Sequence, residues 1–207
     1  ITQVGITGSG PQGNAANERI RDTIWERNWW ALPASGDTIQ IRHAFTASET
    51  TIRNNIVEVS GNGSDHRVFY VQMTNTVPGY PVPDQVRFYN NSVFSSDTGS
   101  NFGFVQLQAP ITNITIKNNL VYAPGDAAPV LTFGTGASGI VIANNSSNAN
   151  ITAVSPAWTS PTPASPADFI LTAPSYIAAD PTVPVFSDFF RRARPFTAPM
   201  DIGATEF

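Results

Sequence analysis

The chain has 207 residues, a net charge of −4 and no cysteine, and only 13% of its residues are charged, about half of the ~25% usual in soluble domains. The lack of cysteine excludes disulfides and thiolate metal sites, and without a basic block we expect no nucleic-acid partner. No apolar run approaches the roughly 18 residues of a membrane helix, so we expect no membrane span. The opening residues are already strand-like, and we expect Ile1 to begin a processed or truncated product.

A short apolar strand that ends in paired asparagines recurs along the chain. The first asparagine of the pair is assigned to Asn54, Asn90, Asn118 and Asn144, with a weaker copy at Asn28, where a tryptophan replaces the second one. Successive first asparagines are 26, 36, 28 and 26 residues apart. The long spacing, from Asn54 to Asn90, contains a Pro/Gly-rich insert at residues 77–83. A fixed period of this size predicts a repeat architecture.

A second set of apolar strands lies before the asparagine pairs, at residues 38–42, 68–72, 104–108 and 130–133. Two or three short strands per repeat of about 25 residues are typical of a parallel β-helix, a solenoid in which each coil stacks on the next. Asparagine tolerates the positive φ of a sharp turn, and its amide can bond to the same residue of the next coil. We therefore predict an all-β fold, with residues 1–147 forming the coils; only residues 14–32 offer a competing helical spacing.

Residues 148–207 have a different character. They begin with a Pro/Ser/Thr-rich stretch at residues 155–163, which predicts an extended strap. We expect this C-terminal segment to cap the end of the coil stack, because an open sheet edge needs covering. Four aromatic residues are expected to help close that end: Phe186, Phe189, Phe190 and Phe196.

Four stretches of this segment match a recurrent tail: Asp168-Phe169-Ile170-Leu171, Pro174–Asp180, Arg192-Ala193-Arg194-Pro195 and Asp201–Phe207. With the asparagine coils, they resemble bacterial secreted right-handed parallel β-helix repeat proteins of the pectate-lyase-like superfamily, over roughly residues 37–207. The departure is the reversed serine-proline order at Pro174-Ser175. The resemblance implies a right-handed β-helix in an extracellular or cell-surface protein that handles polysaccharide, as a lyase, a glycoside hydrolase or a non-catalytic module.

Candidate catalytic residues gather in the first half of the chain. A polysaccharide lyase needs a base, a positive charge at the uronate carboxylate and a donor to the leaving oxygen. Residues of these types are Arg42, His43, Arg53, His66 and Arg67; the alternative is that they are solvated strand and turn residues. A glycosidase needs two carboxyl groups roughly 5–10 Å apart, and no acidic pair repeats along one strand face among Glu26, Glu58, Asp65, Asp84 and Asp97.

Candidate binding residues follow one strand face down the expected stack. One predicted row contains Gln40, Tyr70 and Gln106, and the next places Gln72 and Gln108 beside Arg42. Such rows suit a glycan chain or a plain solvated face. Of the adjacent Trp29 and Trp30, one should point inward and one outward, the outer one as a sugar platform or packed under a long loop. Asp65 is the candidate calcium ligand, in a Gly/Asn-rich stretch equally typical of a turn.

The sequence thus favours an extracellular, polysaccharide-acting β-helix protein, with lyase chemistry on a uronate-containing glycan ahead of hydrolysis. The alternative is a non-catalytic structural or adhesive fibre or surface component. Such a component would assemble through the β-helix ends, with another protein chain or copy at the N-terminal end of the stack.

Overall fold

The computed structural model describes residues 24–32, 36–42, 49–60, 66–72, 84–96, 102–107, 111–125, 131–146, 155–175, 177–195 and 199–207. These residues form strands, turns and loops, and a single 3₁₀ helix, η1 (Pro166–Phe169), is the only helix among them. The predicted all-β class is confirmed for this part of the chain. Within the same residues, no helix has the length and apolar character needed to cross a membrane.

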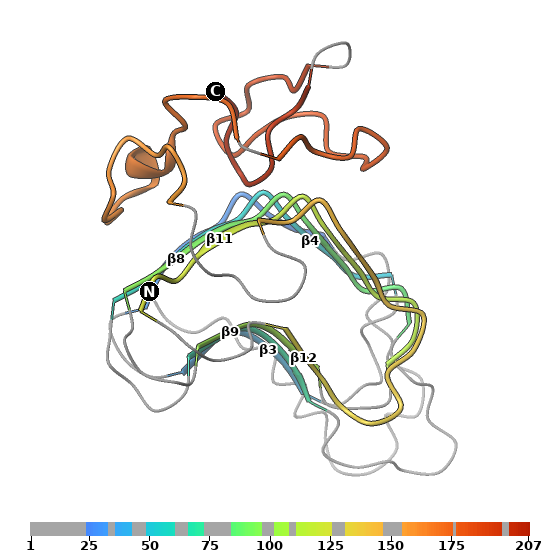
Figure 1. Cartoon of the computed structure of the whole chain (residues 1–207). Helices are drawn as coiled ribbons and strands as arrows, with labels where there is room; N and C mark the ends of the chain where they lie inside the picture. Colours follow the sequence, from blue (N-terminus) through green and yellow to red (C-terminus); the bar gives the residue numbers. More distant parts are fainter. Residues whose placement is uncertain are drawn as a thin grey trace.

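Thirteen strands in the described residues form three parallel sheets (Figure 1). The first sheet contains β1 (Ile24–Glu26), β4 (Thr51–Arg53), β7 (Arg87–Tyr89), β10 (Thr115–Lys117) and β13 (Val141–Ala143). The second contains β2 (Trp29–Leu32), β5 (Ile56–Val59), β8 (Ser92–Ser95) and β11 (Leu120–Tyr122). The third contains β3 (Gly36–Arg42), β6 (His66–Gln72), β9 (Phe102–Leu107) and β12 (Leu131–Phe133).

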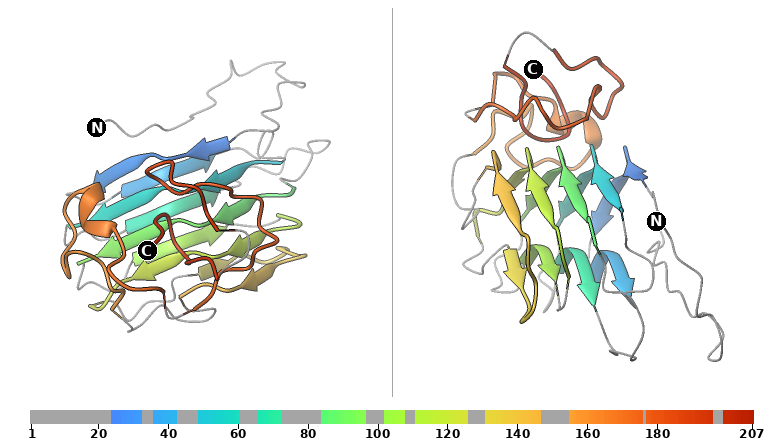
Figure 2. Two further views of the ribbon diagram at one scale, coloured as in Figure 1. Left: turned by 90° about the horizontal axis from the view of Figure 1, so that it is seen from above. Right: turned by 90° about the vertical axis from the view of Figure 1, so that its right-hand side faces the viewer.

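In every sheet, the neighbouring strands are three apart in chain order, so the chain visits the three sheets in turn and then repeats the circuit (Figure 2). We call one such circuit a coil. All strand pairs are parallel, and equivalent positions of successive coils stand side by side. This arrangement is consistent with the parallel β-helix that the repeat predicts. It also confirms that residues 24–32 belong to a coil instead of a helix.

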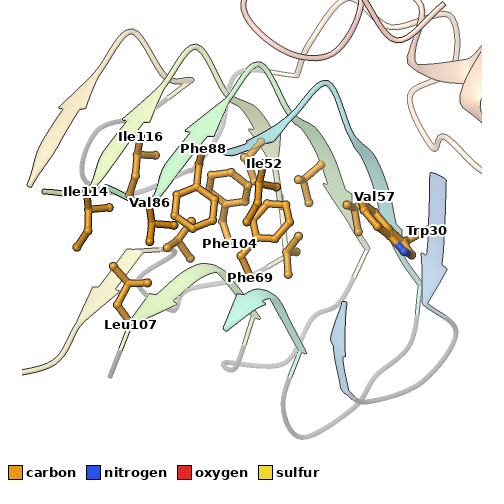
Figure 3. Packing of buried hydrophobic residues seen from close by; sticks show 14 of the residues in the cluster. Trp30, Ile52, Val57, Phe69, Val86, Phe88, Phe104, Leu107, Ile114 and Ile116 are labelled. Atoms are coloured by element: carbon orange, nitrogen blue, oxygen red, sulfur yellow. The ribbon is translucent and has the colours of Figure 1, made fainter. Parts of the chain in front are cut away.

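The core lies between the sheets and is built from their inward side chains (Figure 3). Phe69 stacks near Phe88 and Phe104, with ring centroids 5.3 and 5.5 Å apart. Fully burying a side chain of this kind contributes about 1.5–3 kcal/mol. In β6 the consecutive Val68 and Phe69 are both in the core, so the in–out alternation of the strand slips by one residue there.

The two asparagines of each pair have separate structural roles. The first has a left-handed backbone, with φ of 52° at Asn54, 50° at Asn90, 59° at Asn118 and 53° at Asn144, which asparagine tolerates better than most residues. The second forms a buried ladder through Asn55, Asn91, Asn119 and Asn145. At each step, the backbone N–H and the side-chain Nδ2 of one asparagine donate to Oδ1 of the next, over 2.8–3.1 Å.

The first coil differs from its prediction by one residue. Arg27, with φ of 55°, has the left-handed backbone there, and Asn28 donates to Asn55 as the second, ladder member of the pair. In the first sheet Glu26 therefore stands opposite Arg53. The assignment of Asn28 as the first asparagine of a pair was wrong. The ladder position requires a side-chain amide, which Asn28 supplies. The left-handed turn position before it accepts a different side chain, here that of Arg27. Arg27 Nε reaches the carbonyl oxygen of Asp188.

The C-terminal segment packs along one side of the stack, over the outer faces of the first and second sheets (Figures 1 and 2). It forms a second hydrophobic core with the outward residues of the second sheet, in which Trp158 and Phe169 meet Phe94 and Trp29. This position differs from the expected cap over the stack end. Phe189 contacts this second core, Phe186 is 62% exposed and Phe190 is 38% exposed; Phe196 lies outside the described residues. The C-terminal segment lies on the side of the stack because it buries the outward aromatic residues of the second sheet there.

Candidate functional site

The outer face of the third sheet is the face turned away from the C-terminal segment (Figure 1). The strand register places residues of the predicted rows at equivalent positions of the third sheet. Gln40, Tyr70 and Gln106 occupy equivalent positions on three successive coils, and Thr132 continues the row on β12. The next predicted row begins with Arg42 opposite Gln72. Gln108 lies outside the described residues, so its place in that row stays a prediction.

Arg67 is the charged side chain whose geometry is described on this face. Its guanidinium carbon lies 3.9 Å from the centroid of the Tyr70 ring, a cation–π contact that contributes about 0.5–2 kcal/mol. In the register Arg67 stands between Asp37 of β3 and Gly103 of β9, and a Cβ at that glycine would meet Arg67 Cγ at an ordinary 3.8 Å. Tyr70 itself is only 3% exposed. Its ring therefore lies under the Arg67 guanidinium and is itself almost fully covered.

The other predicted catalytic residues divide between two sheets. Arg42 and His66 lie on β3 and β6 of the third sheet, the sheet that also carries Arg67. Arg53 lies on β4 of the first sheet, where Nε donates to Glu26 Oε2 over 2.7 Å and Nη1 donates to the carbonyl oxygen of Pro184 over 3.0 Å. Arg53 thus ties the C-terminal segment to the coils. His43 lies outside the described residues.

The two adjacent tryptophans point to opposite sides of β2, as predicted. Trp30 is 6% exposed and lies in the central core. Trp29 packs against the second core, with its ring centroid 5.8 Å from that of Phe169. Both rings are thus engaged in packing, and the outer one is covered by a long loop segment, the second of the two predicted roles.

The predicted candidate acids that the structure describes do not pair with one another. Glu26 stands opposite Arg53 in the first sheet, Glu58 lies between Ala31 and Phe94 in the second, and Asp84 is bridged to Thr112 at a corner. None of these three acids faces another acid in the coil register. The predicted acids that the structure describes therefore give no support for a two-carboxyl centre.

The environments of these acids also differ. Burial raises the pKa of Glu58, and a hydrogen bond from Ser60 opposes it only partly. Burial also acts to raise the pKa of Glu26, but hydrogen bonds and charges from Arg53 and Arg27 outweigh it and lower the pKa. Glu58 therefore holds its proton more tightly than a free carboxyl group, whereas Glu26 forms ion pairs with Arg27 and Arg53.

No calcium site is supported by the described residues. They contain no group of three or more histidine, cysteine, aspartate or glutamate side chains that could hold a metal ion. Asp65, the predicted ligand, lies outside them, so its role stays a prediction.

A buried charge cluster in the C-terminal segment explains two of the tail motifs. Arg194 is 2% exposed and forms an ion pair with Glu206. Its guanidinium also donates to the carbonyl oxygens of Asp201 and Gly203, over 3.0 and 2.7 Å, and to Asn54 Oδ1 over 3.2 Å. The Arg-x-Arg-Pro motif thus holds the Asp-Ile-Gly-Ala-x-Glu motif and joins both to a left-handed corner of the coils. The sequence contained both motifs, but their spacing did not show that they meet.

Comparisons with protein-family models, curated proteins and solved structures find no match to this chain. The family resemblance of the tail and coils therefore stays a prediction, and the functional argument rests on the geometry described above.

Proposed function

We propose that this chain is part of an extracellular, right-handed parallel β-helix protein that binds an acidic polysaccharide along the outer face of the third sheet. Polysaccharide lyase chemistry is the activity that we propose for this face. The observation that carries the proposal is Arg67, held over Tyr70 beside a coil-to-coil row of amide and hydroxyl side chains. The resemblance of the tail to secreted β-helix proteins supports the same class.

The chemistry follows from what each residue type can do. Amides such as Gln106 donate to and accept from sugar hydroxyls, and their repeat along the stack matches a polymer with a repeating backbone. A guanidinium at Arg67 would pair with a uronate carboxylate, with two parallel N–H donors. That pairing would stabilise the negative charge that develops when the neighbouring C–H proton is removed.

In the proposed elimination, a base takes the proton from the carbon next to the carboxylate. The electron pair forms a C=C bond, the glycosidic C–O bond breaks, and the leaving oxygen receives a proton. His43 and His66 are the candidate bases, because histidine titrates near neutral pH, and Arg42 is the candidate donor to the leaving oxygen. The separation of the predicted acids Glu26, Glu58 and Asp84 favours this reaction over two-carboxyl hydrolysis at these acids.

The test separates binding from chemistry. Affinity electrophoresis in gels containing a uronate polymer or a neutral polymer should show retardation only by the former, weakened about tenfold or more in Arg67→Ala. Arg87→Ala is the matched control, because Arg87 lies on the first sheet and bonds to Gln85. Equal retardation of the two variants would contradict the proposed face.

Lyase activity is then followed by the absorbance of unsaturated products on a panel of uronate polymers. Arg42→Ala, His43→Ala and His66→Ala should each reduce the signal without loss of retardation. Retardation of the parent protein with no unsaturated product on any polymer would leave a binding module and contradict the lyase assignment.

A further inference from the structure

Residues 186–194 of the C-terminal segment form a short β-hairpin with antiparallel arms. In its loop, Asp188 N donates to the carbonyl oxygen of Arg192 over 2.8 Å, and Arg191 N donates to that of Asp188 over 3.1 Å. Arg191 has a left-handed backbone, with φ of 67°. A hairpin loop in which a turn is followed by one left-handed residue favours glycine at that position. An arginine there is strained, and strain of this kind is commonly retained at functional positions.

The side chain of Arg191 makes no contact that offsets this strain. Elsewhere the left-handed residues use their side chains: Arg27, Asn54 and Asn118 each donate to a backbone carbonyl oxygen of the C-terminal segment, over 2.7–3.2 Å. Arg191 is exposed, and its guanidinium has no hydrogen bond or ion pair with the described residues. It is therefore open to a partner outside the chain.

The exposed charges of the hairpin are positive. Three carboxyl groups lie beside it and are 0%, 7% and 7% exposed: Asp188, Asp201 and Glu206. The side chain of Arg192, in contrast, is 45% exposed, and Arg191 is exposed beside it. An approaching partner meets the two arginines before the acids. Charge complementarity therefore favours an anionic partner here, although the protein has a net charge of −4.

An aromatic ring adjoins these charges. Phe190 is 38% exposed, and its ring packs edge to face on Phe189, with centroids 5.0 Å apart. The guanidinium carbon of Arg192 lies 5.8 Å from the Phe190 centroid. The ring can cover the apolar C–H face of a sugar, and Arg191 can pair with a carboxylate through two parallel N–H donors. One partly exposed ring offers little apolar surface to a lipid bilayer, so an acidic glycan fits this tip better than an anionic membrane.

We propose that the hairpin tip, Phe190-Arg191-Arg192, is a second binding site for an acidic polysaccharide. The C-terminal segment lies over the first and second sheets, on the side away from the outer face of the third sheet (Figure 1). A polymer on the third sheet therefore leaves the tip open to another polymer, and one molecule joins two polymer chains. The class of polymer rests on the proposed function, but the second site consists of different residues.

Affinity electrophoresis in a uronate-polymer gel tests the tip in the Arg67→Ala background, where the third-sheet face is weakened. Adding Arg191→Gly should weaken the remaining retardation about tenfold or more. Adding Arg87→Ala, which removes an arginine from the first sheet, should leave it unchanged. In urea unfolding, Arg191→Gly should have a higher midpoint than the parent, because glycine adopts the left-handed backbone without strain. A lower midpoint, or equal retardation of the two double variants, would overturn the proposed second site.

Turbidity of mixtures with the same polymer tests whether one molecule joins two chains. The parent should form turbid networks, and Arg67→Ala and Arg191→Gly should each abolish them while the remaining site still retards the protein. If only Arg67→Ala changes retardation and turbidity, the second site is refuted and the proposed function stands. If only Arg191→Gly changes them, the third-sheet face is refuted and the tip stands. Binding of the parent to phosphatidylserine vesicles and not to the polymer, lost in Arg191→Gly, would assign the tip to a membrane and overturn the proposed glycan site.

Discussion

Replacing one interior member of the asparagine ladder should destabilise the fold far more than replacing the terminal member. Asn91 is fully buried and its side chain takes part in four hydrogen bonds. It accepts from Asn55 N and Nδ2, over 3.1 and 2.9 Å, and donates to the carbonyl oxygen of Ile52 and to Asn119 Oδ1, over 3.1 and 2.9 Å. Asn91→Ala removes all four.

The cost follows from which partners remain unsatisfied. Asn55 N has no other acceptor among the hydrogen bonds described, and an unsatisfied buried donor costs about 1–3 kcal/mol. With the net loss of the other bonds, Asn91→Ala should lower the free energy of unfolding by about 3–5 kcal/mol. Asn28→Ala removes two bonds at a half-buried position, to Glu26 O and Asn55 Oδ1, and should cost about 1 kcal/mol.

Equilibrium unfolding in urea, followed by tryptophan fluorescence and by circular dichroism, measures the difference between the two alanine variants. Both probes should give the same midpoint for the comparison to be valid. If Asn91→Ala costs no more than Asn28→Ala, the ladder is not the stabilising element that we infer.

Three further changes test the C-terminal segment and the second sheet. Gly203→Ala should lower the free energy of unfolding in urea by about 2–4 kcal/mol, because φ is +92° and a Cβ would lie 2.7 Å from a side-chain oxygen of the coils. Gly103→Ala should be tolerated, because a Cβ there would lie 3.8 Å from its nearest contact. Equal losses in the two variants would contradict the tight docking of the C-terminal segment. The hydrogen bond from Lys117 lowers the pKa of Asp180 from 3.8 to about 2, so this pair stabilises the fold above pH 3.8 and the contribution is lost as the pH falls toward 2. In thermal melts, Asp180→Asn should therefore abolish the part of the pH dependence of the melting temperature that lies between these values. A melting temperature that falls equally in the parent and the variant over this range would contradict the prediction. Burial raises the pKa of Glu58 above 4.5, so ionisation of this carboxyl group lowers the stability of the fold as the pH rises. Glu58→Gln should therefore be more stable than the parent at pH 7, and the two proteins should be equally stable below pH 4.5. A variant that is less stable than the parent at pH 7 would contradict the prediction and indicate that hydrogen bonds stabilise the ionised carboxylate.

The repeat could be predicted because each coil solves the same local problem with the same residues. A left-handed corner and a buried amide ladder both favour asparagine, so Asn54-Asn55 and its later copies are visible in the sequence. In the first coil, only the ladder position is an asparagine, Asn28, and the turn position is Arg27. The pattern then admitted two alignments, and the register differed from the prediction by one residue, at Arg27.

The position of the C-terminal segment could not be predicted from the sequence. Its contacts join residues more than a hundred positions apart, such as Arg194 and Asn54, and no local pattern encodes such pairs. The outward aromatic residues of the second sheet, Trp29 and Phe94, were the available signal that this face is covered. For the candidate site, the sequence identified the rows of the third sheet, but the support of Arg67 by the Tyr70 ring depends on a slip in strand alternation at Val68.

The stacking of coils in register is tested most directly by disulfide formation, because the chain contains no cysteine of its own. Thr51 stands opposite Arg87 on the adjacent strand, about 4.8 Å away and within the Cα separation that a disulfide requires. Thr51→Cys with Arg87→Cys should therefore oxidise to an intramolecular disulfide in the folded protein. Thr51→Cys with Thr115→Cys, two strands apart and about 10 Å away, should remain reduced. Equal oxidation of both pairs, or of neither, would contradict the register on which the account depends.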